Sequence, residues 1–190
     1  MKLIIASNNK HKIYEIKKIL GDKFDEILSA REAGIDHETV EDGSTFLENA
    51  AKKAREIAEI SGQCALADDS GICVDLLGGA PGIYSARYSG EHGNDEENNR
   101  LILKNLGDSA ERGAHYVCAM VLAYPDGSQV SAEGYMYGSI TKEPRGNAGF
   151  GYDPLFLPVG ESRTVAEMTD EEKNAISHRA NALKLLLSKL

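Results

Sequence analysis

Apolar residues recur along the chain with two different spacings, and these spacings predict its first elements. Residues 2–7 (KLIIAS) form a short, continuous and β-branched run, which is typical of a buried strand. Residues 13–20 (IYEIKKIL) carry apolar side chains every three or four positions, which predicts a helix that ends at Gly21. A strand, a loop and a helix in this order favour an α/β protein.

A second helix is predicted after Thr45, because Thr45 and Glu48 have the spacing of a capping box. Its apolar face consists of Leu47, Ala50, Ala51, Ala54, Ile57 and Ala58. The polar residues Asn49, Lys53 and Glu56 lie away from that face. The preceding segment, residues 22–43, is mixed and acidic.

The rest of the chain alternates strands, glycine-rich loops and helices. Residues 64–77 predict two apolar strands separated by a polar turn at Asp68-Asp69-Ser70-Gly71. The later elements are expected in this order: a glycine-rich loop over 78–94, a helix that starts near Asn94 and ends at Gly107, a hairpin over 114–140, a second glycine-rich loop over 142–158, an acidic turn capped by Thr169 and a last helix after Ser177. Without an internal repeat or linker, the prediction is a single domain over residues 1–190.

Composition and charge exclude some classes of binding partner. The 190 residues are 42% hydrophobic, carry a net charge of -9 and have a pI of about 5.1. Because the chain is this acidic, we expect no nucleic-acid partner, and any polyanionic ligand should be small. No apolar stretch has transmembrane length, so no membrane partner is expected. Cys64 and Cys118 lie in apolar runs, which favours buried thiols in a reducing compartment and a cytoplasmic location.

Basic residues occupy the first turns of two predicted helices. Lys10, His11 and Lys12 stand where the first helix begins, and His178 and Arg179 open the last one. Cations are unfavourable at this end of the helix dipole by only about 0.3–1 kcal/mol, so solvated side chains on an ordinary crossover are one interpretation. A bound phosphate is the other, because it would accept hydrogen bonds from backbone N–H groups and pair with these cations.

Acidic residues gather at two other places. Asp68 and Asp69 follow a predicted buried strand, and Glu41 lies just before the second helix. Both places also fit ordinary Asx turns. However, neighbouring carboxylates repel one another unless a cation or proton intervenes, and their oxygens suit Mg²⁺ bridging to substrate phosphates. Together with the basic helix starts, these carboxylates indicate a phosphoryl-transfer site.

The segment 149–154 (GFGYDP) places two aromatic residues between glycines. It is compatible either with a tight turn carrying core aromatics or with a pocket for a purine base, in which an aromatic ring stacks and Asp153 meets the polar edge. The sequence contains neither a P-loop nor a dinucleotide fingerprint, no G-x-S-x-G nucleophile motif, and no zinc-ligand spacing.

Five motifs in order make the chain resemble the inosine triphosphate pyrophosphatase family, which includes the bacterial dITP/XTP pyrophosphatases. They are SNNKHK, TFLENAAKKAR, ADDSGICVDLLGGAPGIYSARYSG, GFGYDPLF and EEKNAISHRANAL, and they span residues 3 to 187. The resemblance implies an elongated mixed β-sheet flanked by helices, with two lobes around a central cleft. It also implies a homodimer that hydrolyses dITP, ITP and XTP to the monophosphate and pyrophosphate with Mg²⁺.

The resemblance also implies roles for individual residues. Asp69 is the catalytic carboxylate, and Glu41 and Asp69 are the metal ligands. The implied substrate-binding residues are Ser7, Asn8, Asn9, Lys10, His11, Lys12, Lys53, Ser70, Phe150, Gly151, Tyr152, Asp153, Lys173, His178 and Arg179. In the implied mechanism, a metal-activated water that Asp69 deprotonates attacks the α-phosphorus, and the cations absorb the charge of the leaving pyrophosphate.

Two positions depart from the family's pattern. Asn8 stands where glycine is common, and Asn147-Ala148 replaces a frequent Thr-Gly pair. The first change restricts the backbone conformations of residues 7–12, which we call the phosphate loop. The second change shifts residues 150–153, which we call the base loop. Two other functions remain open at this stage: a non-catalytic purine-nucleotide-binding protein, and a pyrophosphatase for modified pyrimidine nucleotides.

Overall fold

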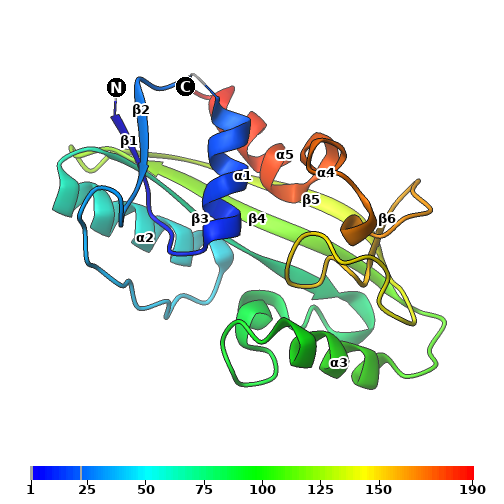
Figure 1. The fold of residues 1–190 in the computed structure, drawn as a ribbon. Coiled ribbons are helices and arrows are strands. Elements are labelled where there is room, and N and C mark those ends of the chain that lie inside the picture. The colour runs from blue at the N-terminus through cyan, green and yellow to red at the C-terminus, as the bar shows by residue number, and fades with distance from the viewer. Residues whose placement is uncertain (1, 22) are drawn as a thin grey trace. The chain divides into compact units, whose positions relative to one another are not determined.

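The computed structural model describes residues 2–21 and 23–190, whose elements are drawn in Figure 1. The strands are β1 (Lys2–Ile5), β2 (Glu26–Ser29), β3 (Cys64–Val74), β4 (Gly113–Ala123), β5 (Gln129–Ile140) and β6 (Phe156–Pro158). The helices are α1 (Lys10–Leu20), α2 (Phe46–Ser61), α3 (Asp95–Leu106), α4 (Asp170–Ile176) and α5 (His178–Leu187), with the short 3₁₀ helices η1 (Asp75–Leu77), η2 (Gly82–Arg87) and η3 (Val165–Glu167).

These strands form one six-stranded sheet in the order β2-β1-β3-β4-β5-β6. Strand β1 pairs in parallel with both β2 and β3, whereas β5 and β6 are antiparallel. The sheet is therefore mixed and flanked by helices, which confirms the predicted fold class.

Two compact units are formed by the packing of the chain. The first unit comprises everything up to Asp69 together with residues 118–134 and 179–190, and the second unit comprises residues 70–117 and 135–178. The long strands β3, β4 and β5 each contribute residues to both units.

In the first unit, the strands bury side chains on both faces. Leu3 and Ile5 of β1 pack in a cluster with apolar residues of α1 and α5, whereas Ile4 between them packs in a second cluster with α2. This alternation is the two-residue period of a strand, and it accounts for the continuous apolar run seen in the sequence. Helices α1 and α5 lie side by side (Figure 1) because both cover the first cluster.

The second unit has its own core. Ile72 and Tyr116 from the long strands pack there with Tyr152 and Phe156 and with the apolar face of α3. Helix α3 begins after Asn94, whose side chain accepts a hydrogen bond from the Glu97 amide, as its sequence predicts.

Most helices begin and end where the sequence predicts. Thr45 caps α2 by accepting a hydrogen bond from the Glu48 amide at 3.1 Å, and Gly62 ends that helix in the left-handed conformation. The expected reciprocal bond of the capping box is absent from the contacts described, because the Glu48 carboxylate accepts instead from Ser44 at 2.7 Å. After Thr169 the sequence predicts only a capped acidic turn, whereas the structure has the seven-residue helix α4, at which Thr169 forms a complete capping box.

One prediction about strands was wrong, and one strand was not predicted. Residues 64–74 form one continuous strand, not two strands separated by a turn at Asp68-Asp69. The carboxylates are tolerated inside a buried strand because cations from other elements surround them, as described below. The acidic segment before α2 contains the short strand β2, whose pattern is too brief to stand out but which pairs with β1 at the sheet edge.

Cysteine and membrane predictions can also be compared with the structure. Cys64 and Cys118 are buried as expected, and the described residues form no disulfide. Among the helices of the described chain, none has both the length and the apolar character needed to cross a membrane.

Candidate active site

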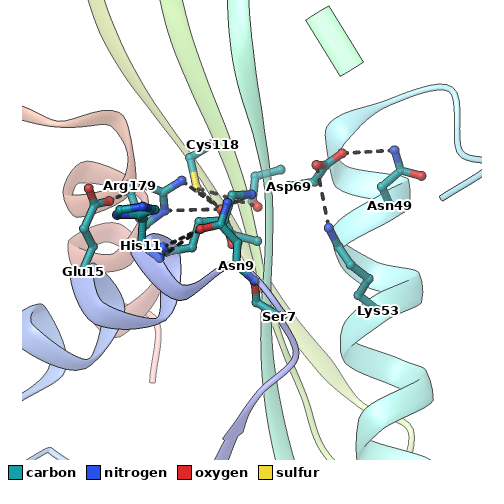
Figure 2. A network of polar contacts seen from close by, with 12 residues as sticks. Ser7, Asn9, His11, Glu15, Asn49, Lys53, Asp69, Cys118 and Arg179 are labelled. Atoms are coloured by element: carbon teal, nitrogen blue, oxygen red, sulfur yellow. Dashed lines mark hydrogen bonds and ion pairs between the residues drawn. The ribbon is translucent and has the colours of Figure 1, made fainter. Parts of the chain in front are cut away.

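Strand β3 carries two adjacent carboxylates that point to opposite faces of the first unit. Because successive residues of a strand alternate in direction, Asp68 faces α1 and α5, and Asp69 faces α2. Figure 2 shows Asn49 and Lys53 approaching Asp69 from α2, while Arg179 and Glu15 lie on the other side of the strand. The two aspartates therefore have different environments although they are neighbours in the sequence.

Asp68 is the centre of a buried ionic network. Its Oδ2 atom lies 3.0 Å from Lys12 Nζ and accepts hydrogen bonds from Arg179 Nε at 3.3 Å and Nη2 at 3.2 Å. Arg179 also donates to Glu15. Burial alone would raise the pKa of Asp68, but Lys12, Arg179 and Lys53 hold it well below its usual range. Asp68 therefore stays ionised at neutral pH.

Asp69 is buried on the opposite face among fewer cations. Its Oδ2 accepts a hydrogen bond from Asn49 Nδ2 at 3.0 Å, and its Oδ1 lies 3.7 Å from Lys53 Nζ. Burial, with a contribution from Glu41, raises the pKa of Asp69 above its ordinary 3.8, although Lys53 and Lys12 oppose that rise. Environments that move the pKa values of two neighbouring carboxyl groups apart are typical of acid–base sites, and Asp69 is the member suited to accept a proton.

Glu41 and Asp69 converge on a single cation, the ammonium of Lys53. Lys53 Nζ lies 2.6 Å from Glu41 Oε1 as well as 3.7 Å from Asp69 Oδ1. Burial would lower the pKa of Lys53, but Asp69, Glu41 and Asp68 outweigh it and raise the pKa above 10.5. Lys53 therefore stays charged at neutral pH.

The same two carboxylates fit the requirements of Mg²⁺. Hard oxygen donors are its preferred ligands, and it is commonly held by one or two carboxylates together with substrate phosphates and water. Within residues 2–21 and 23–190, no group of three or more His, Cys, Asp or Glu side chains could hold a metal ion. A Mg²⁺ ion bound through Glu41 and Asp69 would thus need oxygen ligands from a phosphate substrate and from water.

The segment that carries Glu41 is fastened to α2 along its length. We call residues 36–43 the metal loop. His37 Nε2 and Thr39 Oγ1 contact the same oxygen of Glu56, at 2.7 and 2.6 Å. The Gly43 amide donates to Asn49 Oδ1 at 2.8 Å. Because the loop has no regular structure, these side-chain contacts fix the place of Glu41.

The residues before α1 cap that helix. Asn9 Oδ1 accepts hydrogen bonds from the amides of His11 and Lys12 at 3.0 and 3.2 Å, and Ser7 Oγ accepts one from the Asn9 amide. Asn8, Asn9, Lys10 and His11 are exposed at this helix start. The predicted phosphate loop is therefore an ordered N-cap at the surface of the first unit.

A second group of predicted residues meets in the second unit. Lys173 Nζ lies 2.8 Å from Asp153 Oδ2 and 4.8 Å from the centre of the Phe150 ring. Asp153 Oδ2 also accepts a hydrogen bond from the Phe150 amide at 3.1 Å. The second glycine-rich loop and α4 thus form one polar and aromatic cluster, which is compatible with the predicted base-binding role.

Of three more predicted residues in this unit, Tyr152 and His178 are buried in packing contacts. Tyr152 is buried, and its hydroxyl donates to the Ser85 carbonyl oxygen at 2.7 Å. His178 is also buried, and its ring stacks on Tyr116 at 4.6 Å with an interplanar angle of 8°. Ser70 follows Asp69 in β3 and is partly exposed.

Sequence reasoning missed Asn49 and Glu15 as members of the candidate site. Asn49 is 1% exposed and bridges Asp69 to the metal loop, and Glu15 shares Arg179 with Asp68. A signal for Asn49 was present, since Asn49 and Lys53 are one helical turn apart on the same polar face of α2. Nothing comparable marks Glu15, whose partner is distant in the sequence.

The fold and these residue clusters define an α/β protein with a site built from carboxylates and a lysine. Comparisons with known proteins assign the chain to a family. The model of the Ham1 family matches residues 3–189, so the chain belongs to the Ham1 family. A curated relative from Clostridium perfringens, the dITP/XTP pyrophosphatase, is 52% identical, with 100% of this chain and 97% of the relative covered.

Solved structures agree with this assignment. The Staphylococcus aureus Ham1 protein is 39% identical and superposes with a TM-score of 0.89, covering 100% of this chain and 97% of that one. A HAM1 protein from Coxiella burnetii is 38% identical, with a TM-score of 0.90 and 100% of both chains covered. The resemblance inferred from the five motifs is thereby confirmed.

Proposed function

We propose that this protein hydrolyses non-standard purine nucleoside triphosphates, namely dITP, ITP and XTP, to the nucleoside monophosphate and pyrophosphate. The observation that carries the proposal is the pair of adjacent carboxylates on β3, of which Asp68 contacts Lys12 and Arg179 while Asp69 contacts Asn49 and Lys53. The relative from Clostridium perfringens, whose name states this activity, supports the proposal over the full length of the chain.

The residues around Asp69 divide the chemistry between them. Asp69 takes the proton of the attacking water at a carboxylate oxygen, and its burial beside Lys53 keeps that carboxylate within the candidate site. Asn49 orients that carboxylate through the 3.0 Å hydrogen bond to Oδ2. Lys53, which stays charged, offsets negative charge on the phosphates of the substrate.

Glu41 and Asp69 are the residues that would hold Mg²⁺. When bound, the ion supplies positive charge to the triphosphate and lowers the pKa of a coordinated water. The predicted contacts of Ser7, Asn8, Asn9, Lys10 and His11 with phosphate remain part of the proposal.

Arg179 is assigned a different part from the one that its sequence suggested. Arg179 is 1% exposed, and its side chain and that of Lys12 both contact Asp68. We assign to Arg179 the task of holding Asp68 and α5 in place, while Lys12, which is partly exposed, remains a candidate phosphate ligand.

Base recognition is assigned to residues of the second unit. Phe150 offers an aromatic ring, and the backbone of Gly151 and the Lys173–Asp153 pair offer polar groups. Hypoxanthine and xanthine carry a 6-oxo acceptor where adenine carries a 6-amino donor, so a site that presents a donor there leaves groups unpaired with adenine. Ser70, Tyr152 and His178 complete the proposed set of substrate-binding residues.

A substrate panel assayed for released pyrophosphate tests the proposal directly. We expect turnover of ITP, dITP and XTP with Mg²⁺, little turnover of ATP or GTP, and none after chelation of the metal. Tight binding of ITP without product would favour a non-catalytic nucleotide-binding protein. Preference for a modified pyrimidine triphosphate would favour the other enzymatic alternative, and equal turnover of all purine triphosphates would refute the proposed selectivity.

We also propose that the protein is a cytoplasmic homodimer, as the family resemblance implies. Its cysteine thiols, which form no disulfide among the described residues, agree with a reducing compartment. Light scattering coupled to gel filtration tests the dimer, since a mass near 20.6 kDa would instead indicate a monomer.

A further inference from the structure

Two side chains of α3 hold both polar groups of one residue in the proposed base loop. Asp95 Oδ2 accepts a hydrogen bond from the Gly151 amide at 2.6 Å, and Asn99 Nδ2 donates to the Gly151 carbonyl oxygen at 2.8 Å. Asp95 and Asn99 are four residues apart, so they lie one above the other on the same face of the helix. All three residues belong to the second unit.

This pair of contacts determines the backbone conformation of Gly151. Its amide and its carbonyl belong to the peptide groups on either side of the same Cα atom, so fixing both groups fixes the torsions between them. Gly151 has φ +63°, a conformation that favours glycine, and a Cβ atom there would meet nothing within 4 Å. The requirement at this position is therefore one of backbone conformation and not of space.

The orientation of the Asn99 amide is itself fixed. Nδ2 donates to the Asp95 carbonyl oxygen at 2.8 Å as well as to that of Gly151. The reversed amide would place its oxygen against two carbonyl oxygens, which is repulsive. The hydrogen bond to its own helix thus orients the Asn99 amide to donate to the Gly151 carbonyl oxygen.

Other contacts hold the flanks of the base loop and leave its centre to α3. On one side, the Phe150 amide donates to Asp153, which also binds Lys173. On the other side, the Tyr152 hydroxyl is anchored to the Ser85 carbonyl. Gly151 lies between these anchors, so its conformation decides how the Phe150 ring and the following backbone groups are presented.

We propose that Asp95 and Asn99 are positioning residues that set the preference for hypoxanthine over adenine by holding Gly151. The inference rests on the proposed function, in which residues 150–153 recognise the base. Neither side chain is expected to contact the nucleotide, because each is engaged with the loop backbone. Their effect should therefore appear in discrimination between bases and not in the hydrolytic step.

The test compares Asn99→Ala and Asp95→Ala with two matched variants. Asp95→Asn retains an oxygen that can accept from the Gly151 amide. Asn105→Ala removes an amide on the same helix that donates only, among the contacts described, to the Tyr88 hydroxyl. Steady-state rates with ITP and ATP give kcat and KM, and calorimetric titration with IMP and AMP gives affinities without turnover.

We expect both alanine variants to lose about tenfold in kcat/KM for ITP, mainly through KM, because each removes one hydrogen bond of the loop. The ratio of kcat/KM for ITP to kcat/KM for ATP should fall by the same factor. For Asp95→Asn we expect a kcat/KM within about threefold of the wild type, and for Asn105→Ala the wild-type value. Equal losses for ITP and ATP, or an unchanged ratio, would overturn the inference.

The binding measurements separate this inference from the proposed function. If the wild-type protein prefers IMP to AMP and the alanine variants lose that preference, the inference stands even where no triphosphate is hydrolysed. If the wild-type protein hydrolyses ITP selectively but the variants retain the IMP preference, the proposed function stands and the inference fails. If the wild-type protein binds IMP and AMP equally, the inference also fails. Thermal unfolding of each variant shows whether a loss of activity or affinity reflects misfolding. If an alanine variant misfolds, Asp95→Asn is compared with the wild type instead.

Discussion

Replacing Asp68 with asparagine should destabilise the protein far more than replacing Asp69. The Asp68 side chain is 0% exposed, and its oxygen lies 3.0 Å from Lys12 and within 3.3 Å of Arg179. Asparagine has almost the same volume, so the loss is electrostatic: Lys12 and Arg179 keep their positive charges while the buried anion between them is removed. Breaking a buried ion pair in this way typically costs about 3–5 kcal/mol.

Asp69 should respond in the opposite sense. Because its pKa is raised in the folded state, folding disfavours its ionised form. The stability that its protonated form contributes is fully present below the unfolded pKa and is lost as the pH rises through the folded pKa. At pH 7 a neutral asparagine relieves this cost, so we expect Asp69→Asn to lie within about 1 kcal/mol of the wild type. It should nevertheless abolish turnover.

Urea unfolding at pH 7 measures both effects, with thermal unfolding as a second reading. For a chain of this size, about 3–5 kcal/mol corresponds to a fall in Tm of roughly 6–20 °C. The Asp68 pKa is lowered, so the difference between wild type and Asp68→Asn should be complete above the unfolded pKa, near 3.8, and shrink as the pH falls through the folded pKa. Wild-type stability in Asp68→Asn, or a larger loss in Asp69→Asn, would refute the reasoning.

Three further predictions concern the surroundings of the candidate site. Asn49→Ala removes a hydrogen bond that lowers the pKa of the candidate base, so the acid limb of the kcat/KM profile should move to higher pH; an unmoved limb would contradict this assignment. Gly149 and Gly160 both have positive φ, but only at Gly149 would a Cβ atom collide with a neighbouring carboxylate. Gly149→Ala should therefore lose at least about tenfold in ITP turnover, while Gly160→Ala should keep its activity with a modest loss in Tm; similar activities would count against the base loop. Glu56→Ala removes the contacts that hold the metal loop and should raise the half-saturating Mg²⁺ concentration about fivefold, which corresponds to about 1 kcal/mol. Glu59→Ala, on the exposed face of the same helix, should leave that concentration unchanged. Calorimetry measures metal binding without depending on turnover.

Local signals were sufficient for most of the helices. The caps at Thr45, Asn94 and Thr169 depend on side chains within three residues of the amides that they bind, so the sequence displays both partners. The mixed sheet was implied by the family resemblance, and its strands at 114–140 followed from apolar runs around a turn. Strand β2 was missed because its stability comes from pairing with β1, and the sequence of its own four residues carries no signal for that pairing.

The candidate site was predictable in its residue types but not in its contacts. Asp69, Glu41 and Lys53 were recognised, and the structure brings them together. Arg179, by contrast, was assigned to phosphate, and its guanidinium lies against Asp68, 111 positions away in the chain. Whether any of the predicted ligands touches phosphate stays a prediction. Sequence patterns reveal which charges are present, whereas long-range folding decides which of them neutralise one another.

The wrong prediction at Asp68-Asp69 shows why a strand is needed there. A turn would have exposed both carboxylates to water on the same side, where their environments, and hence their pKa values, would be similar. A strand sends one to a face lined by Lys12 and Arg179, and the other to a face with Asn49 and Lys53. The cations on the first face lower the pKa of Asp68 below its usual range, while burial on the second raises that of Asp69. Two chemically identical neighbours thereby take different roles, because the two-residue period of the strand separates them.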